Sequence, residues 1–154
     1  MTALLSYLSF DGRINRRRYW LIVLSIFGIF LACGVLVGVM AAILPILMIL
    51  LVPVFLALTY ASFANGARRL HDRGKSAWWL LLFFGLPLLL SLPARATQYS
   101  PDQGAQAAGA LFALLGLPFS IWGFIEMGCR KGQTGPNRFG EDPLPPVEAA
   151  VAFV

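Results

Sequence analysis

The chain has 154 residues, of which 58% are hydrophobic and 12% are charged, and its formal net charge is +5. Soluble domains carry about 25% charged residues, so this composition excludes an ordinary water-facing surface. It is typical of a protein built into a membrane, and a soluble protein with unusually apolar buried helices is the alternative.

Two membrane spans are predicted in the window from residue 19 to residue 67, which contains no Asp, Glu, Lys or Arg. A spanning helix needs roughly 20 mostly apolar residues, so the window holds two. Pro45 lacks a backbone donor and places the bend near the middle, which predicts spans over about residues 19–43 and 46–64. Arginines precede the first span as in a signal peptide, but the apolar run exceeds the about 7 to 15 residues of a signal sequence. We therefore expect a retained span.

Two further uncharged windows, residues 76–94 and 103–125, hold one span each. The third helix is predicted over about residues 78–92, closed by Pro93, and the fourth over about residues 107–127. The sequence therefore predicts an all-α membrane protein in which four transmembrane helices form two hairpins, within a single domain of residues 1–143.

Short segments flank the spans. The stretch LLSYLSF at residues 4–10 places leucines on one helical face and is too short to span, which predicts a helix lying on the membrane surface. The tail at residues 144–154 is predicted to be flexible. Gly34, Gly38 and Ala42 recur every four residues in the first span, which predicts close packing against another helix of the same chain.

The positive charges predict the orientation in the membrane. Of the 12 Lys and Arg residues, all except Arg95 lie before the first span, between the second and third, or after the fourth. Short loops rich in Lys and Arg face the cytoplasm, so both termini are expected there. Trp20 and Trp79, at the starts of the first and third spans, are expected to anchor at the same interface.

Cations also stand where helices are predicted to begin. The stretch ARRLHDRGKSAWW at residues 67–79 is predicted to be a cytoplasmic loop with Ser76 capping the third span, and Asn15 is predicted to cap the first. Cations beside the free N–H groups of a helix start attract an anion. An anionic lipid phosphate is favoured because each juxtamembrane cation gains about 1 kcal/mol from an anionic leaflet. The alternatives are a soluble phosphorylated ligand and internal pairing with one of the chain's own carboxylates, at Asp11, Asp72, Glu126, Glu141 or Asp142.

Two residues raise the question of catalysis or transport. His71 stands beside Asp72 as a general base would, but it is the single histidine and no nucleophile or metal-ligand spacing accompanies it. We therefore predict no enzyme, no metal and no cofactor. Glu126, the one carboxylate within a predicted span, lies one turn before Arg130 and is expected to pair with it. A small transporter or channel component is the alternative function.

Three stretches, FDGRINRRRYW (10–20), ARRLHDRGKSAWW (67–79) and GPNRFGEDP (135–143), resemble the small bacterial inner-membrane proteins grouped as domain of unknown function 805. Ala77 stands where that family often has glycine. The resemblance implies a multi-pass protein of the inner membrane and lends no established activity. We predict that the stretches assemble into one cytoplasmic face that binds anionic lipid headgroups or a phosphorylated partner. A protein partner or a second copy remains open, and nucleic acid is not expected. The predicted site residues are Arg13, Arg16, Arg17, Trp20, Arg68, Arg69, His71, Asp72, Arg73, Lys75, Ser76, Trp79, Asn137 and Arg138.

Overall fold

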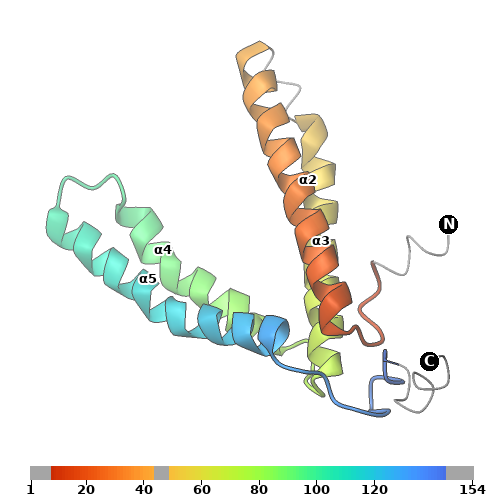
Figure 1. The fold of residues 1–154 in the computed structure, drawn as a ribbon. Coiled ribbons are helices and arrows are strands. Elements are labelled where there is room, and N and C mark those ends of the chain that lie inside the picture. The colour runs from red at the N-terminus through yellow and green to blue at the C-terminus, as the bar shows by residue number, and fades with distance from the viewer. Residues whose placement is uncertain (1–7, 44–48, 145–154) are drawn as a thin grey trace.

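The computed structural model describes residues 8–43 and 49–144, and this part of the chain is helical, without a β-strand. Two hairpins, α2 with α3 and α4 with α5, meet at one end and spread apart toward their loops (Figure 1). The elements in chain order are α2 (Arg16–Ile43), α3 (Val52–Asp72), the π-helical turn η2 (Leu81–Gly85), α4 (Leu86–Thr97), α5 (Gln103–Phe124) and the π-helical turn η3 (Ile125–Cys129). The all-α prediction with four helices is confirmed for these residues. The predicted bend at Pro45, and most of the predicted surface helix and tail, lie outside the described residues.

Three helical segments are long and apolar enough to cross a membrane, namely Arg16–Met40, Ile49–Asp72 and Gln103–Cys129. At most 17% of the most apolar window of each is buried inside the protein. The remaining apolar helix, Leu81–Thr97, is shorter. Soluble monomers do not expose apolar faces of this extent, so these helices suit a hydrocarbon surrounding.

Side-chain caps fix the starts of two helices. The Arg18 N–H donates to Asn15 Oδ1 at 2.8 Å, as predicted for the cap of α2. Asp102 caps α5 by accepting from the Gly104 N–H, also at 2.8 Å. Both helices consequently begin a few residues before the predicted span starts at about residues 19 and 107.

Helix α3 is longer than predicted and contains most of the cationic stretch. The predicted span ended at Ala64, whereas α3 continues to Asp72. The prediction of a loop from residue 67 is therefore wrong for its first six residues. All residues from Ala64 to Asp72 are buried, and their charged groups find partners inside the protein, so they do not need a solvated loop.

The end of α3 is set by Gly74. This glycine has a φ of +70°, and the Lys75 N–H donates to the Leu70 carbonyl at 2.9 Å. Both features define a Schellman ending, in which a residue in the left-handed conformation terminates the helix. The loop between the hairpins therefore starts just after the charged residues of α3.

The third apolar helix does not stop at Pro93. It continues to Thr97, so the predicted end at residue 92 is wrong. The helix contains a π-helical turn before Pro87, and wide turns of this kind often accompany prolines inside helices. The packing of α4 along α5 stabilises the helix by more than the loss of the one hydrogen bond that Pro93 cannot donate destabilises it.

Glycines of α5 allow α4 to pack closely. Gly109, Gly116 and Gly123 are buried and lie seven residues apart on one face. A Cβ added at any of them would come within 2.8 to 3.0 Å of a carbon atom on the facing helix. The facing residues are Ala94, Pro87 and Phe83 respectively. These three glycines, which we call the glycine seam, allow the close helix packing that we predicted for the first span. In the first span, a Cβ at Gly34 or Gly38 would meet nothing within 4 Å.

We expect Gly109→Ala to lower the free energy of unfolding by about 1 to 3 kcal/mol, because the new methyl group would lie 2.8 Å from the Ala94 Cα, a backbone atom that cannot turn away. Gly38→Ala is the matched control, since it faces open space on α2 and alanine is the better helix former by about 1 kcal/mol. Unfolding by SDS in mixed micelles measures both, and equal stability of the two variants would contradict the seam.

Candidate functional site

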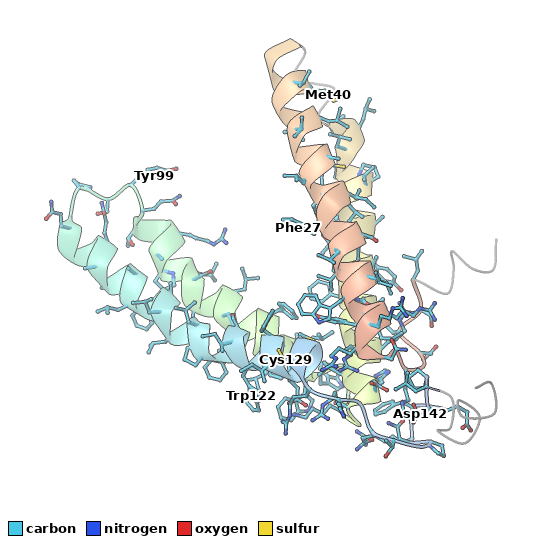
Figure 2. All side chains as sticks on the ribbon, in the orientation of Figure 1. Phe27, Met40, Tyr99, Trp122, Cys129 and Asp142 are labelled. Carbon is cyan, nitrogen blue, oxygen red and sulfur yellow. The ribbon has the colours of Figure 1, made fainter. Side chains whose placement is uncertain are left out.

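Side chains that carry nitrogen gather where the two hairpins meet, below Cys129 and near Asp142 in Figure 2. The structure brings together here the three stretches that carry the predicted site. Residues 10–20 lead into α2, residues 67–79 end α3 and form the loop after it, and residues 135–143 follow η3. Side-chain contacts link all three.

The first group, the Asp72 cluster, consists of Asp72, Arg13 and Arg69. Arg13 donates from Nε and Nη2 to Asp72 Oδ1, at 3.2 and 3.1 Å. Arg69 Nη1 pairs with Oδ2 of the same carboxylate. The three side chains are at most 3% exposed. Two buried guanidiniums therefore share one carboxylate, which joins the segment before α2 to the end of α3.

Other N–H groups of the two guanidiniums in this cluster donate to backbone carbonyls. Arg69 donates from Nε to the Met127 carbonyl at 2.7 Å and from Nη2 to the Arg130 carbonyl. Arg13 Nη1 donates to the Gly135 carbonyl at 2.6 Å. Carbonyls at a helix end lack intrahelical partners, and the two bonds from Arg69 engage such carbonyls and tie the end of η3 to α3. The bond from Arg13 ties the segment after η3 to the segment before α2. Both arginines, which we predicted to hold an anion, are engaged within the chain.

The second group, the Glu126 cluster, consists of Glu126, Arg73, Lys75 and Arg130. Glu126 lies in η3 and is 0% exposed. Its Oε1 is 3.0 Å from Arg73 Nε and 3.4 Å from Lys75 Nζ, and its Oε2 is 2.9 Å from Arg130 Nη1. The expected pair with Arg130 is present, and the other two pairs join the loop after α3 to η3. Three cations around one carboxylate leave this cluster positively charged.

His71 holds the third stretch against the other two. Its Nδ1 lies 3.2 Å from the Gly12 carbonyl, which only accepts, so Nδ1 is the donor. The imidazole stacks on Phe139 with ring centroids 4.0 Å apart and planes 4° apart. The backbone carbonyl of His71 accepts from Asn137 Nδ2 at 3.0 Å. Both the ring and the backbone of this residue are thus used in packing.

The two predicted anchor tryptophans are partly buried and make polar contacts. Trp20 Nε1 donates to the Gly128 carbonyl at 3.0 Å, and a Cβ on Gly128 would lie 2.6 Å from the indole. Lys75 Nζ lies 4.0 Å from a ring centroid of Trp79, a cation–π distance. These tryptophans therefore contribute to the junction of the hairpins.

Three other predicted residues surround the clusters. Arg68 is buried on α3. Ser76 contributes its backbone carbonyl, which accepts from the Trp79 N–H at 3.3 Å. Arg138 is exposed, and its Nη2 donates to the Gly74 carbonyl at 3.3 Å.

A polar cavity of about 500 Å³ lies at the start of α2. Its lining includes three exposed cations, Arg16, Arg17 and Lys131. We call this cavity the cationic pocket. Arg16 Nη1 donates to the Cys129 carbonyl at 2.9 Å. Among the described residues, no salt bridge includes any of these three cations.

The carboxylates that line the cationic pocket are already engaged. Asp72 belongs to the cluster described above. Asp142 accepts from the Leu144 N–H at 3.0 Å and from the Gly135 N–H at 2.7 Å. These two backbone hydrogen bonds lower the pKa of the Asp142 carboxyl from its ordinary value, that from Leu144 most. The Asp142 carboxylate stays ionised and offsets one of the three cations, so the pocket keeps a net positive charge.

The sequence prediction missed Lys131 and the two residues that follow it, Gly132 and Gln133. The Gln133 N–H donates to the Asp72 carbonyl at 2.8 Å. Gly132 lies against the Asp72 carboxylate so closely that no Cβ fits between them. The available signal in the sequence was a glycine among polar residues directly after the fourth span, which indicates a close contact of the backbone. It does not reveal that the contact is with the end of α3.

The chain is similar in sequence to known bacterial membrane proteins. A family model described as "Protein of unknown function (DUF805)" matches residues 7–141. The inner membrane protein YhaI of Escherichia coli K12 is 28% identical over 145 residues, covering 93% of this chain and 92% of the relative. The inner membrane protein YhaH of the same organism is 28% identical over 155 residues, covering 93% of each. No solved structure matches significantly. With its span-length helices, the chain is a multi-pass protein of the bacterial inner membrane.

Proposed function

This chain belongs to the DUF805 family of inner-membrane proteins, and on that premise we propose that its junction of hairpins is a cytoplasmic face that binds anionic lipid headgroups. The orientation rests on the charge distribution. The Asp72 cluster, the Glu126 cluster and the cationic pocket all lie at one end of the molecule, whereas Arg95 lies on α4 toward the opposite loop. The positive-inside rule then places the junction and both termini in the cytoplasm.

The cationic pocket is the observation that carries the proposal. Its three cations come from two separate segments and surround one cavity, and the N-terminus of α2, the positive end of its helix dipole, lies beside them. The cations of the two clusters are each paired with a carboxylate, whereas those of the cationic pocket form no salt bridge among the described residues, so an added anion is best accommodated here. An anionic leaflet supplies phosphates at this depth and contributes about 1 kcal/mol for each nearby cation.

We expect phosphatidylglycerol to raise the unfolding temperature of the detergent-purified protein, while phosphatidylcholine does not. A lipid concentration of 100 Kd corresponds to about 2.7 kcal/mol of stabilisation. In the triple variant Arg16→Gln, Arg17→Gln, Lys131→Gln the phosphatidylglycerol effect is lost and the lipid-free unfolding temperature stays near that of the wild type. Arg95→Gln is the control, because it removes a cation from the opposite end. An unchanged lipid effect in the triple variant would overturn the proposal, and stabilisation by glycerol 3-phosphate alone would identify a soluble phosphate as the ligand.

We propose binding rather than catalysis or transport as the task of this face. The His71 ring is stacked and hydrogen-bonded, an arrangement that suits packing. Glu126, on which a transport pathway would depend, is occupied by three cations. Among the described residues, no group of three His, Cys, Asp or Glu side chains could hold a metal ion.

A further inference from the structure

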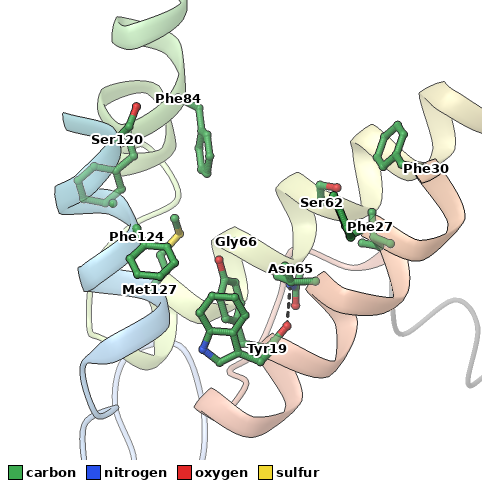
Figure 3. Close-up of a pocket in the computed structure, with 15 residues that line it drawn as sticks. Tyr19, Phe27, Phe30, Ser62, Asn65, Gly66, Phe84, Ser120, Phe124 and Met127 are labelled. Atoms are coloured by element: carbon green, nitrogen blue, oxygen red, sulfur yellow. Dashed lines mark hydrogen bonds between the residues drawn. The ribbon is translucent and has the colours of Figure 1, made fainter. Parts of the chain in front are cut away.

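An apolar cavity lies between the two hairpins, on the membrane side of their junction (Figure 3). Its volume is about 560 Å³, and we call it the hairpin crevice. Helices α2 and α3 form one wall, and α5 with the π-helical turns η2 and η3 forms the other. Aromatic side chains from both walls line it, among them Trp20, Phe27, Phe30, Phe83, Phe84 and Phe124.

One polar group at the crevice has an unmet hydrogen bond. Asn65 is 1% exposed and lines the cavity, and its Oδ1 has no hydrogen-bond partner. Its Nδ2 donates to the Tyr19 carbonyl at 3.4 Å, the long limit for such a bond. A bond this long holds the amide loosely, so rotation about Cβ–Cγ can turn Oδ1 toward a donor in the crevice. A buried acceptor without a donor costs free energy, and here the missing partner is a donor.

The surroundings identify the class of molecule that supplies this donor. The walls are helices of membrane-spanning character, so the crevice opens to bilayer hydrocarbon and not to bulk water. Asn65 lies one helical turn before Arg69, at the end of α3 where the polar clusters begin. This is the depth at which phospholipids change from acyl chain to headgroup. A phospholipid of the cytoplasmic leaflet therefore offers an apolar chain and a polar donor at the required places.

We propose that the hairpin crevice binds one phospholipid, with an acyl chain between the aromatic walls and with a headgroup N–H or O–H donating to Asn65 Oδ1. The crevice shares no lining residue with the cationic pocket, so this site does not depend on the proposed function. It recognises hydrogen-bond donors, whereas the cationic pocket recognises negative charge.

Phosphatidylethanolamine and phosphatidylcholine separate the two kinds of recognition, because both are zwitterionic and only the first carries N–H donors on its headgroup. Native mass spectrometry of the delipidated protein incubated with each lipid counts the molecules retained. We expect one phosphatidylethanolamine per chain, retained roughly two- to tenfold better than phosphatidylcholine, the ratio that one net hydrogen bond supplies.

Two variants test the two parts of this site. Ser120→Phe places a ring in the crevice and is expected to abolish retention, while Leu115→Phe, on an exposed face of α5 away from the crevice, retains the lipid. Asn65→Leu is expected to retain lipid but lose the preference for phosphatidylethanolamine. Full retention by Ser120→Phe, or an unchanged preference in Asn65→Leu, would overturn the proposal. The triple variant of the cationic pocket keeps this site, so failure of either site is recognised separately.

Discussion

Replacing Asp72 by asparagine is expected to lower the free energy of unfolding by about 3 to 5 kcal/mol, the cost of removing one partner from a buried ion pair. Asparagine has nearly the same shape but carries no charge, so the guanidiniums of Arg13 and Arg69 are left without a counterion. Both are buried and cannot reach water without opening the junction. The effect is largest here because one carboxylate compensates two buried cations.

Unfolding by SDS in mixed micelles measures this effect, with Asp11→Asn as the control because Asp11 is exposed. A double-mutant cycle with Arg13→Gln tests the pairing itself. Residues in one ionic network show coupling energies of about 0.5 to 3 kcal/mol. We therefore expect Arg13→Gln to cost less in the Asp72→Asn background than in the wild type. Additive effects of the two substitutions would show that the contact does not contribute to stability.

The helices were predictable because their signal is local. An uncharged window longer than a bilayer crossing specifies a span whatever surrounds it. Helix starts were less accurate where a single polar cap decided them, as Asp102 does for α5. Pro93 misled the prediction for a different reason. A proline ends a helix in water, but close packing against the glycine seam of α5 keeps this one continuous.

The roles of the charged residues were harder to predict, because they depend on contacts between distant segments. Sequence reasoning weighed lipid phosphate above internal pairing for the cations as a group. The structure divides them. Arg13 and Arg69 are buried against Asp72, whereas Arg16 and Arg17 stay exposed beside a cavity. Neighbours in one arginine-rich motif thus have different surroundings, and nothing in the spacing distinguishes them.

We therefore interpret the three stretches that resemble the family mainly as structural, because most of their charged residues hold parts of the protein together. Contacts of the Asp72 and Glu126 clusters join segments that are far apart in the chain, and they lie at the junction of the hairpins beside a small apolar core that includes Leu70, Phe83 and Met127. Packing between apolar helices gains little in a membrane, because lipid tails are as apolar as the side chains. Buried ionic contacts can therefore fix how the two hairpins meet, which leaves the exposed cations available for a ligand.

Glu126→Gln tests this interpretation against a transport function. We expect it to lower the free energy of unfolding by about 2 to 3 kcal/mol, through the loss of charge-assisted hydrogen bonds to a fully buried group. The loss is smaller than for Asp72→Asn because the side chains of Arg73, Lys75 and Arg130 are 18%, 24% and 56% exposed and can turn toward solvent. Glu141→Gln, at an exposed position, is the control.

The same variant separates structure from transport when it is reconstituted in vesicles. If Glu126 serves only to join the hairpins, the loss of stability on Glu126→Gln is reproduced by Arg73→Gln, and the two substitutions couple in a double-mutant cycle. A transport role predicts instead that Glu126→Gln abolishes uptake of a solute at a temperature where the folded fraction is unchanged, while Arg73→Gln leaves uptake intact. The ion pairs around Glu126 favour the first outcome, since a carboxylate held by three cations is poorly placed to release or accept a transported charge.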